Sequence, residues 1–188
     1  MQGIRLGGLI LLAAALFAGC ATTKGTTPQD KRQAILEMKQ ETLSDLYACR
    51  PQARGEVAKA PGYAVFSNAN VNIIFASFGG GYGVVQDARS GKKTYMKMGE
   101  LGIGLGAGAK DFRTVFIFHD SGTLQQFIDS GWEFGGHADA AAKASDMGAA
   151  VGGEAVFDNI TIYQLTESGL ALQATVKGTK YWKDDALN

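Results

Sequence analysis

Apolar and polar residues repeat along this chain with two distinct periods, and the first of them predicts a helix. From about residue 28 to 49, apolar residues recur at steps of three and four between charged ones, at Ile35, Met38, Leu43, Leu46 and Tyr47. This spacing is typical of an amphipathic helix, with Thr27 as its N-cap and Arg50-Pro51 as its end. Because its polar face mixes both signs of charge, we expect the helix to cover a sheet rather than to lie on lipid.

After Pro61-Gly62 the period changes to two, which predicts a series of β-strands. A short helix is expected over about 122–129, and residues 132–140 favour a strand whose Ala-rich end is also compatible with a helix. Because the links are short, neighbouring strands should pair antiparallel, with a hairpin turn over 166–169. The other expected strands cover residues 63–66, 71–78, 83–86, 94–98, 101–109, 113–118, 155–165 and 170–182.

Glycine forms the most specific structural pattern in the chain. Every second residue from Gly102 to Gly108 is glycine and the residues between them are apolar, and the cluster 79–83 is also rich in glycine. A bare strand face costs roughly 0.5–1 kcal/mol per residue relative to alanine, so it is retained where something approaches closely or where a sheet bends. We therefore predict an α+β fold of mainly antiparallel β structure, with a strongly curved or barrel-like Gly-rich sheet, an N-terminal amphipathic helix and one short helix.

The same glycines also fit a dinucleotide-binding pattern, because residues 102–107 read Gly-x-Gly-x-x-Ala. That motif requires a helix to begin inside it. Here the period of two continues to Ala109, and another β-rich segment follows. We therefore expect no nucleotide and no other cofactor.

The first twenty residues have the layout of a secretory signal, with Arg5 before an apolar run that is too short to span a bilayer. Its end, Leu16-Phe17-Ala18-Gly19-Cys20, resembles the lipobox of bacterial lipoproteins. The resemblance implies cleavage before Cys20, lipid attachment to that cysteine and Gram-negative export, and Ala21 implies transfer to the outer membrane. We expect a signal peptide over 1–19, a flexible Thr-rich tether over 20–27 and one domain over 28–188.

Charge and composition exclude several classes of function. Lys+Arg and Asp+Glu number 18 each, so no overall field attracts nucleic acid. Cys49 has no partner within the mature chain, which excludes a disulfide framework. We interpret Cys49 as a small apolar residue packed near a helix end, with a reactive thiol as the alternative.

Catalytic chemistry is not evident in the sequence. The two histidines, His119 and His137, have no metal-ligand spacing, so no metal site is expected. His119-Asp120-Ser121 is better explained as a turn with a helix cap at Asp120 or Ser121 than as a catalytic set. Glu133 and Asp139 would lie near 20 Å apart on one strand, too far for paired carboxylates. We expect a protein without enzymatic activity.

Four motifs in the right order together resemble a SYLF domain of the bacterial lipoprotein branch. They are residues 60–66 (APGYAVF), 79–84 (GGGYGV), the glycine ladder leading into 115–118 (VFIF), and 134–140 (FGGHADA). The closing part of the pattern is matched by Tyr163, Gly169, Leu170, Gly178, Asp184 and Asn188. The resemblance spans about 31–188 and implies lipid binding without a known enzymatic activity. In eukaryotic members, binding of phosphoinositides and actin depends largely on an N-terminal helical or basic segment. Here the lipid anchor, the Thr-rich tether and the charge-balanced helix take its place, so actin binding is not carried over.

Two basic groups are candidates for contact with membrane phospholipid, anionic headgroups included. Arg89, Lys92 and Lys93 occupy a hairpin tip, and Lys177, Lys180 and Lys183 lie on the last strand beside Tyr181 and Trp182. Two solvated strand ends remain an alternative, because Lys180 alternates to the opposite face from Lys177 and Lys183. An envelope protein partner for the sheet, or a lipid enclosed by a barrel, are further alternatives.

Overall fold

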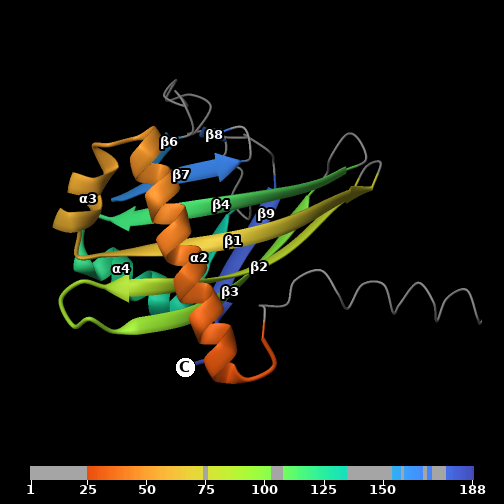
Figure 1. Ribbon diagram of the computed structural model, residues 1–188, viewed down its shortest axis with the longest axis horizontal. Coiled ribbons are helices and arrows are strands. Elements are labelled where there is room, and N and C mark those ends of the chain that lie inside the picture. Colours follow the sequence, from red (N-terminus) through yellow and green to blue (C-terminus); the bar gives the residue numbers. More distant parts are fainter. Residues whose placement is uncertain are drawn as a thin grey trace, which may run out of the picture.

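The fold is built on one antiparallel sheet with helices on both faces (Figure 1). The computed structural model describes residues 25–73, 76–102, 108–134, 154–157, 159–166, 169–170 and 177–188. The helices are α2 (Pro28–Cys49), α3 (Ala53–Lys59) and α4 (Ser121–Ser130). The predicted signal peptide with Cys20, most of the tether and the segment 135–140 lie outside the described residues.

Within the described residues the sheet has nine strands, and every pairing is antiparallel, as predicted. Its order is β5-β9-β3-β2-β1-β4-β7-β6, and β8 pairs with β7. The strands are β1 (Gly62–Ile73), β2 (Ala76–Asp87), β3 (Lys93–Gly102), β4 (Gly108–Phe118), β5 (Trp132–Phe134), β6 (Glu154–Phe157), β7 (Ile160–Thr166), β8 (Gly169–Leu170) and β9 (Lys177–Lys183).

Helix α2 begins and ends where the sequence predicted. The hydroxyl of Thr27 accepts a hydrogen bond from the backbone N–H of Asp30, and the Asp30 carboxylate accepts one from the N–H of Thr27, both at 3.1 Å. This reciprocal capping box satisfies two donors at the helix start. At the other end the N–H of Arg50 donates to the carbonyl of Leu46 at 2.7 Å. The buried side chains of α2 pack on the sheet, which confirms the helix as a cover. Helix α3 was not predicted.

Several predicted strand boundaries are wrong, because short apolar runs do not reveal where a strand turns. The strand predicted over 71–78 includes the end of β1 and the start of β2, which pair with each other. The strand predicted over 155–165 is divided into β6 and β7 at Asn159, whose φ of 68° marks a turn. The strand predicted over 101–109 is also wrong, because Gly102 ends β3 and Gly108 begins β4, while β2 and β1 lie between these strands.

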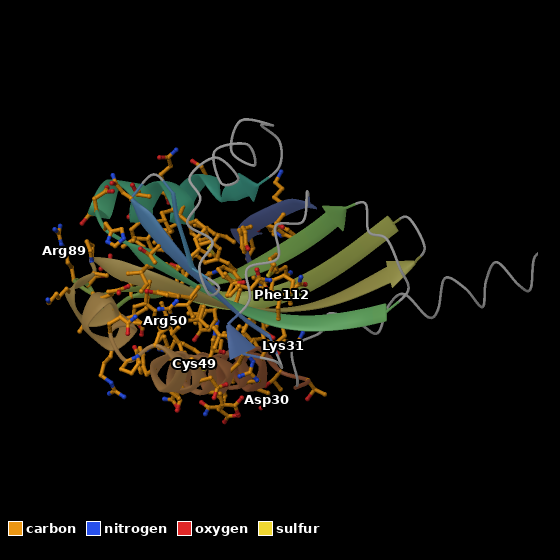
Figure 2. The ribbon with its side chains drawn as sticks, turned by 90° about the horizontal axis from the view of Figure 1, so that it is seen from above. Asp30, Lys31, Cys49, Arg50, Arg89 and Phe112 are labelled. Atoms are coloured by element: carbon orange, nitrogen blue, oxygen red, sulfur yellow. The ribbon has the colours of Figure 1, made fainter. Side chains whose placement is uncertain are left out.

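The two faces of the sheet have different covers. The face that carries Val65, Val84 and Val115 packs against α2 and α3. The opposite face carries Phe66, Met96, Phe116 and Tyr181, and packs against Leu124, Phe127 and Ile128 of α4. Figure 2 shows the sheet lying between α2 and α3 on one side and α4 on the other. The core is therefore divided by the sheet into two layers.

The sheet bends strongly towards the face that α4 covers. Tyr181 in β9 lies 5.3 Å from Phe116 in β4 and 4.7 Å from Phe66 in β1, measured between ring centroids. Four strand spacings separate β9 from β4, which would place them roughly 19 Å apart in a flat sheet. We call the face that carries these rings the concave face, and the one under α2 the convex face. The curvature was predicted, but the barrel is not supported, because the edge strands β5 and β6 do not pair with each other in the described structure.

Glycines of β2 allow this bend. Gly81 and Gly83 lie on the concave face, and a Cβ added at Gly83 would lie 2.7 Å from Cγ of Phe66. At Gly81 it would lie 2.8 Å from Cγ of Met98. The close approach predicted for a bare strand face is therefore present in this cluster. The comparable prediction for 103–107 concerns residues outside the described part of the chain.

Asp120 is the N-cap of α4. The sequence predicted a cap at either Asp120 or Ser121, and the first of these is confirmed. Its carboxylate accepts hydrogen bonds from the backbone N–H of Thr123 at 2.8 Å and from the Thr123 hydroxyl at 2.6 Å. These bonds, the side-chain one foremost, hold the pKa of Asp120 below its ordinary value. The neighbouring His119 contacts the hydroxyl of Thr161 through Nε2 at 2.8 Å. Asp120 and His119 therefore make separate structural contacts.

Replacing Gly83 by alanine should destabilise the fold, because the added methyl group collides with the Phe66 ring and the β1 backbone. We expect a loss of about 1–3 kcal/mol in the free energy of unfolding, measured by urea denaturation. Gly55→Ala is the matched control. Its new Cβ would meet nothing within 4 Å in α3, so this variant should gain about 0.5–1 kcal/mol. Equal effects of the two changes would contradict the proposed packing.

The charge of Asp120 should make a pH-dependent contribution to stability. Because the folded pKa is lower than the ordinary value of 3.8, the contribution is present at neutral pH and is lost as the pH falls through the folded pKa. Asp120→Asn keeps an acceptor for the cap but not the charge. We expect the variant to unfold at lower urea than the wild type at neutral pH and at equal urea well below the carboxyl range. A difference that does not change with pH would rule out this role of the charge.

Candidate functional site

The turn between β2 and β3 presents the first predicted basic group. Asp87 organises this turn, because its carboxylate accepts hydrogen bonds from the backbone N–H groups of Arg89 at 2.8 Å and Ser90 at 3.0 Å. These bonds lower the pKa of Asp87, with the Ser90 N–H as the largest cause. Gly91 completes the turn with a φ of 70°. The side chains of Arg89, Lys92 and Lys93 are exposed at its end (Figure 2 labels Arg89).

The two lysines of this turn approach different helices. Lys93 lies near Lys39 of α2, and its charge lowers the pKa of Lys39, although burial of Lys39 is the larger cause. Lys92 lies on the α4 side, where its charge helps to lower the pKa of Asp129. Larger causes there are the hydrogen bonds from Gln125 and Lys183. Within the described residues, Arg89, Lys92 and Lys93 form no salt bridge. The turn therefore presents three exposed cations, of which Arg89 lies near the carboxylate of Asp87 and Lys92 near that of Asp129.

The predicted basic group on β9 is divided between the two faces of the sheet. Tyr181 lies on the concave face, and alternation places Lys183 there as well. The side chain of Lys177 lies outside the described part of the structure. The ammonium of Lys183 forms a salt bridge of 3.0 Å with Asp129 of α4. Lys180 and Trp182 lie on the convex face. The predicted alternation of Lys180 is confirmed, and the structure does not bring all these lysines together.

Trp182 is the large hydrophobic residue that stands exposed among the described side chains, at 40% of its full accessibility. It lies beside β3, where Cη2 of its ring would be 3.1 Å from a Cβ at Gly99. Its register partner Lys97 forms a salt bridge of 3.0 Å with Asp184. The ring of Trp182 therefore reaches over Gly99, and Trp182 has Lys97 as its partner across the ladder and Lys180 two residues away along the strand.

The C-terminal turn fixes the start of α2 near Tyr95 of β3. Arg32 donates from Nε to the carbonyl of Leu187 at 2.8 Å. The side chain of Asn188 accepts from the N–H of Tyr95 at 2.9 Å and donates to the Tyr95 carbonyl at 2.8 Å. Sequence reasoning missed this set, because a lone Asn and Arg give no periodic signal. The chain leading to the tether thus begins beside β3 and β9, on the convex side.

Other predicted chemistry is only partly described. Cys49 is exposed, so the interpretation of a packed apolar residue is wrong; its position as the last residue of α2 leaves the thiol at the surface. Glu133 lies on β5, whereas Asp139, His137 and Cys20 fall outside the described residues. Within the described part of the chain, no three His, Cys, Asp or Glu side chains gather as metal ligands. No described helix is long and apolar enough to cross a bilayer.

Comparison with known proteins finds a relative of this chain. No protein-family model matches the chain. Beta cell expansion factor A of Aeromonas veronii is 33% identical over 167 residues, which cover 86% of this chain and 60% of that protein. The chain therefore spans about 60% of the length of this curated relative. The similarity covers most of this chain and shows homology to this relative, and the relative's name does not state which domain the two proteins share.

Proposed function

We propose that this chain is a lipoprotein anchored in the outer membrane through Cys20, whose SYLF-like domain contacts phospholipid at the periplasmic face and has no enzymatic activity. The observation that carries the proposal is the exposed Trp182 between Lys97 and Lys180 on one face of the sheet. An amphipathic aromatic ring beside ammonium groups suits the headgroup region of a bilayer. The ordered string of motifs supports the SYLF assignment.

Basic residues near Trp182 extend this surface towards the turn between β2 and β3. Alternation along β3 places Lys93 on the same face as Lys97, and Lys39 of α2 lies near Lys93. The salt bridge with Asp184 offsets the charge of Lys97. The charges that favour an anionic headgroup are therefore chiefly those at the turn, Arg89, Lys92 and Lys93. They contribute to binding only when a membrane is close, and otherwise they are solvated ends of strands.

The proposed anchor would provide this proximity. Eight residues lead from Cys20 to Pro28, and an extended chain of that length spans at most about 28 Å. Because Arg32 holds the start of α2 next to the C-terminal turn, the lipid on Cys20 would keep the convex face near the bilayer. Acyl chains supply the attachment, and the domain would then need only a weak contact of its own.

Binding to vesicles tests the proposal directly. An unlipidated Cys20→Ser form, without the signal peptide, should sediment with vesicles that contain phosphatidylglycerol and less with phosphatidylcholine alone. Replacing both Lys92 and Lys93 by glutamine should weaken binding to the anionic vesicles by roughly tenfold or more, because each surface charge contributes about 1 kcal/mol.

Arg54→Gln is the control, since Arg54 lies on α3 and stacks on Tyr47 with its guanidinium 4.7 Å from the ring centroid. It should change binding little. Charge-independent sedimentation, or equal losses in the control and in the lysine variant, would reject the proposed contact. Capture of an envelope protein that resists detergent, without vesicle binding, would favour a protein partner instead.

A further inference from the structure

Two lysine side chains lie close together on the convex face, beside the β2–β3 turn. Lys93 of β3 pairs with Gln86 of β2, which pairs with Tyr63 of β1, so these residues form one row across three strands. Tyr63 packs against the core cluster under α2, which places this row on the convex face. Lys39 reaches the row from α2, and its Nζ lies over the ring of Tyr63, 5.9 Å from the centroid.

The two ammonium groups repel each other. Within the described residues, neither Lys39 nor Lys93 forms a salt bridge. Lys39 is half-buried, and its burial, followed by the charge of Lys93, lowers its pKa, with no carboxylate acting in the opposite direction. A cation that is half-buried beside another cation destabilises the folded state. Such an arrangement is typical of a functional site, in which a bound anion would offset the repulsion.

Phenolic hydroxyl groups provide hydrogen-bond donors beside these cations. Tyr63 and Tyr47 of α2 are both half-buried, and burial is the largest cause that raises the pKa of each. The proximity of Tyr47 raises the pKa of Tyr63 further. Both hydroxyls are therefore protonated at neutral pH. Within the described residues neither of them makes a hydrogen bond, so each can donate one to an anion.

The β2–β3 turn holds Lys93 in its position. The side chain of Gln86 donates from Nε2 to the carbonyl of Gly91 at 3.0 Å and to the carbonyl of Asp87 at 3.3 Å. These bonds tie the middle of the row to the turn that precedes Lys93. Lys39 is positioned independently by α2, whose neighbouring Met38 is buried in the core. The two cations thus come from separate ordered elements, as a preorganised binding site requires.

We propose that Lys39, Lys93 and the hydroxyl of Tyr63 bind one phosphate monoester as its dianion. A dianion offsets both ammonium charges, whereas a phosphodiester or a carboxylate carries a single negative charge. A phosphate monoester has a charge of about −1.5 to −2 at pH 7 and three acceptor oxygens, which suit two ammonium groups and a phenol. The monoester is either a soluble molecule or a lipid headgroup. The lipid-borne case rests on the phospholipid contact proposed above and names its preferred headgroup class.

Thermal unfolding of the unlipidated Cys20→Ser form tests the site with soluble probes. Glycerol 3-phosphate, a monoester, should raise the unfolding midpoint, because it binds the folded state alone. Dimethyl phosphate, a diester, should raise it less at the same ionic strength. Lys39→Met keeps an apolar chain over Tyr63 but removes the charge. Without ligand this variant should have a higher midpoint than the parent protein, because the repulsion is relieved, and glycerol 3-phosphate should no longer shift it.

Two further variants complete this measurement. Lys31→Met is the matched control, because Lys31 lies in the same helix, eight residues and thus about 12 Å before Lys39 along the axis. It should keep the full response to glycerol 3-phosphate. Tyr63→Phe retains the ring under Lys39 and removes the hydroxyl alone, so it should fold normally and bind glycerol 3-phosphate several times more weakly.

Sedimentation with vesicles tests the lipid-borne monoester. Phosphatidylcholine vesicles with phosphatidic acid, a monoester, are compared with vesicles that contain phosphatidylglycerol, a diester, at equal negative charge. The parent protein should bind the phosphatidic acid vesicles roughly fivefold more tightly, as one additional charge pair at a membrane surface would give. Lys39→Met should lose this preference and still bind phosphatidylglycerol through the turn.

The outcomes separate this inference from the proposed function. Equal binding to both vesicles, with no midpoint shift by glycerol 3-phosphate, would overturn the inference and leave the phospholipid contact in place. A midpoint shift that requires Lys39, without any vesicle binding, would support a soluble monoester and reject the phospholipid contact. Equal responses of Lys39→Met and Lys31→Met to glycerol 3-phosphate, or a lower midpoint of Lys39→Met without ligand, would show a merely structural lysine and would also overturn the inference.

Discussion

The ring of Phe66 lies on the bare backbone of Gly83, and the rest of the structure depends on this contact. A side chain at Gly83 would occupy the volume that the ring fills. With Phe66 in this position, the rings of Phe116, Phe127 and Tyr181 gather around it at centroid distances of 4.7–6.2 Å. Aromatic pairs of this kind contribute about 0.5–1.5 kcal/mol each beyond burial of their area. Packing of these rings brings β9 over the concave face and holds α4 against that face.

This bend also determines which side chains of the convex face remain at the surface. Near the β2–β3 turn, α2 and the C-terminal turn cover the sheet and leave Trp182 with its neighbouring lysines at the surface. The proposed membrane contact would therefore use the exposed ring of Trp182 and the lysines beside it.

The sequence predicted the elements whose signal is local. The N-cap at Thr27, the cap at Asp120 and the antiparallel pairing all follow from neighbouring residues, whereas the reciprocal bond of Asp30 was not predicted. The ends of strands were harder to predict from the sequence. Ile73 and Ala76 belong to different strands, although the apolar pattern continues across them. Asn159 shows the same limit, since a single residue with positive φ divides one predicted strand into β6 and β7. For the candidate site, the alternation of Lys180 was predictable, whereas the salt bridges of Lys183 and Lys97 depend on Asp129 and Asp184, which only the tertiary fold brings near.

The curvature of the sheet is the central claim, and contacts between the rings of Tyr181 and Phe116 test it most directly. Nuclear Overhauser effects between their ring protons should be strong, because the centroids lie 5.3 Å apart. In a flat sheet of the same strand order the two residues would be roughly 19 Å apart, and no such effect would be observed. Its absence in the folded protein, with both rings assigned, would contradict the account.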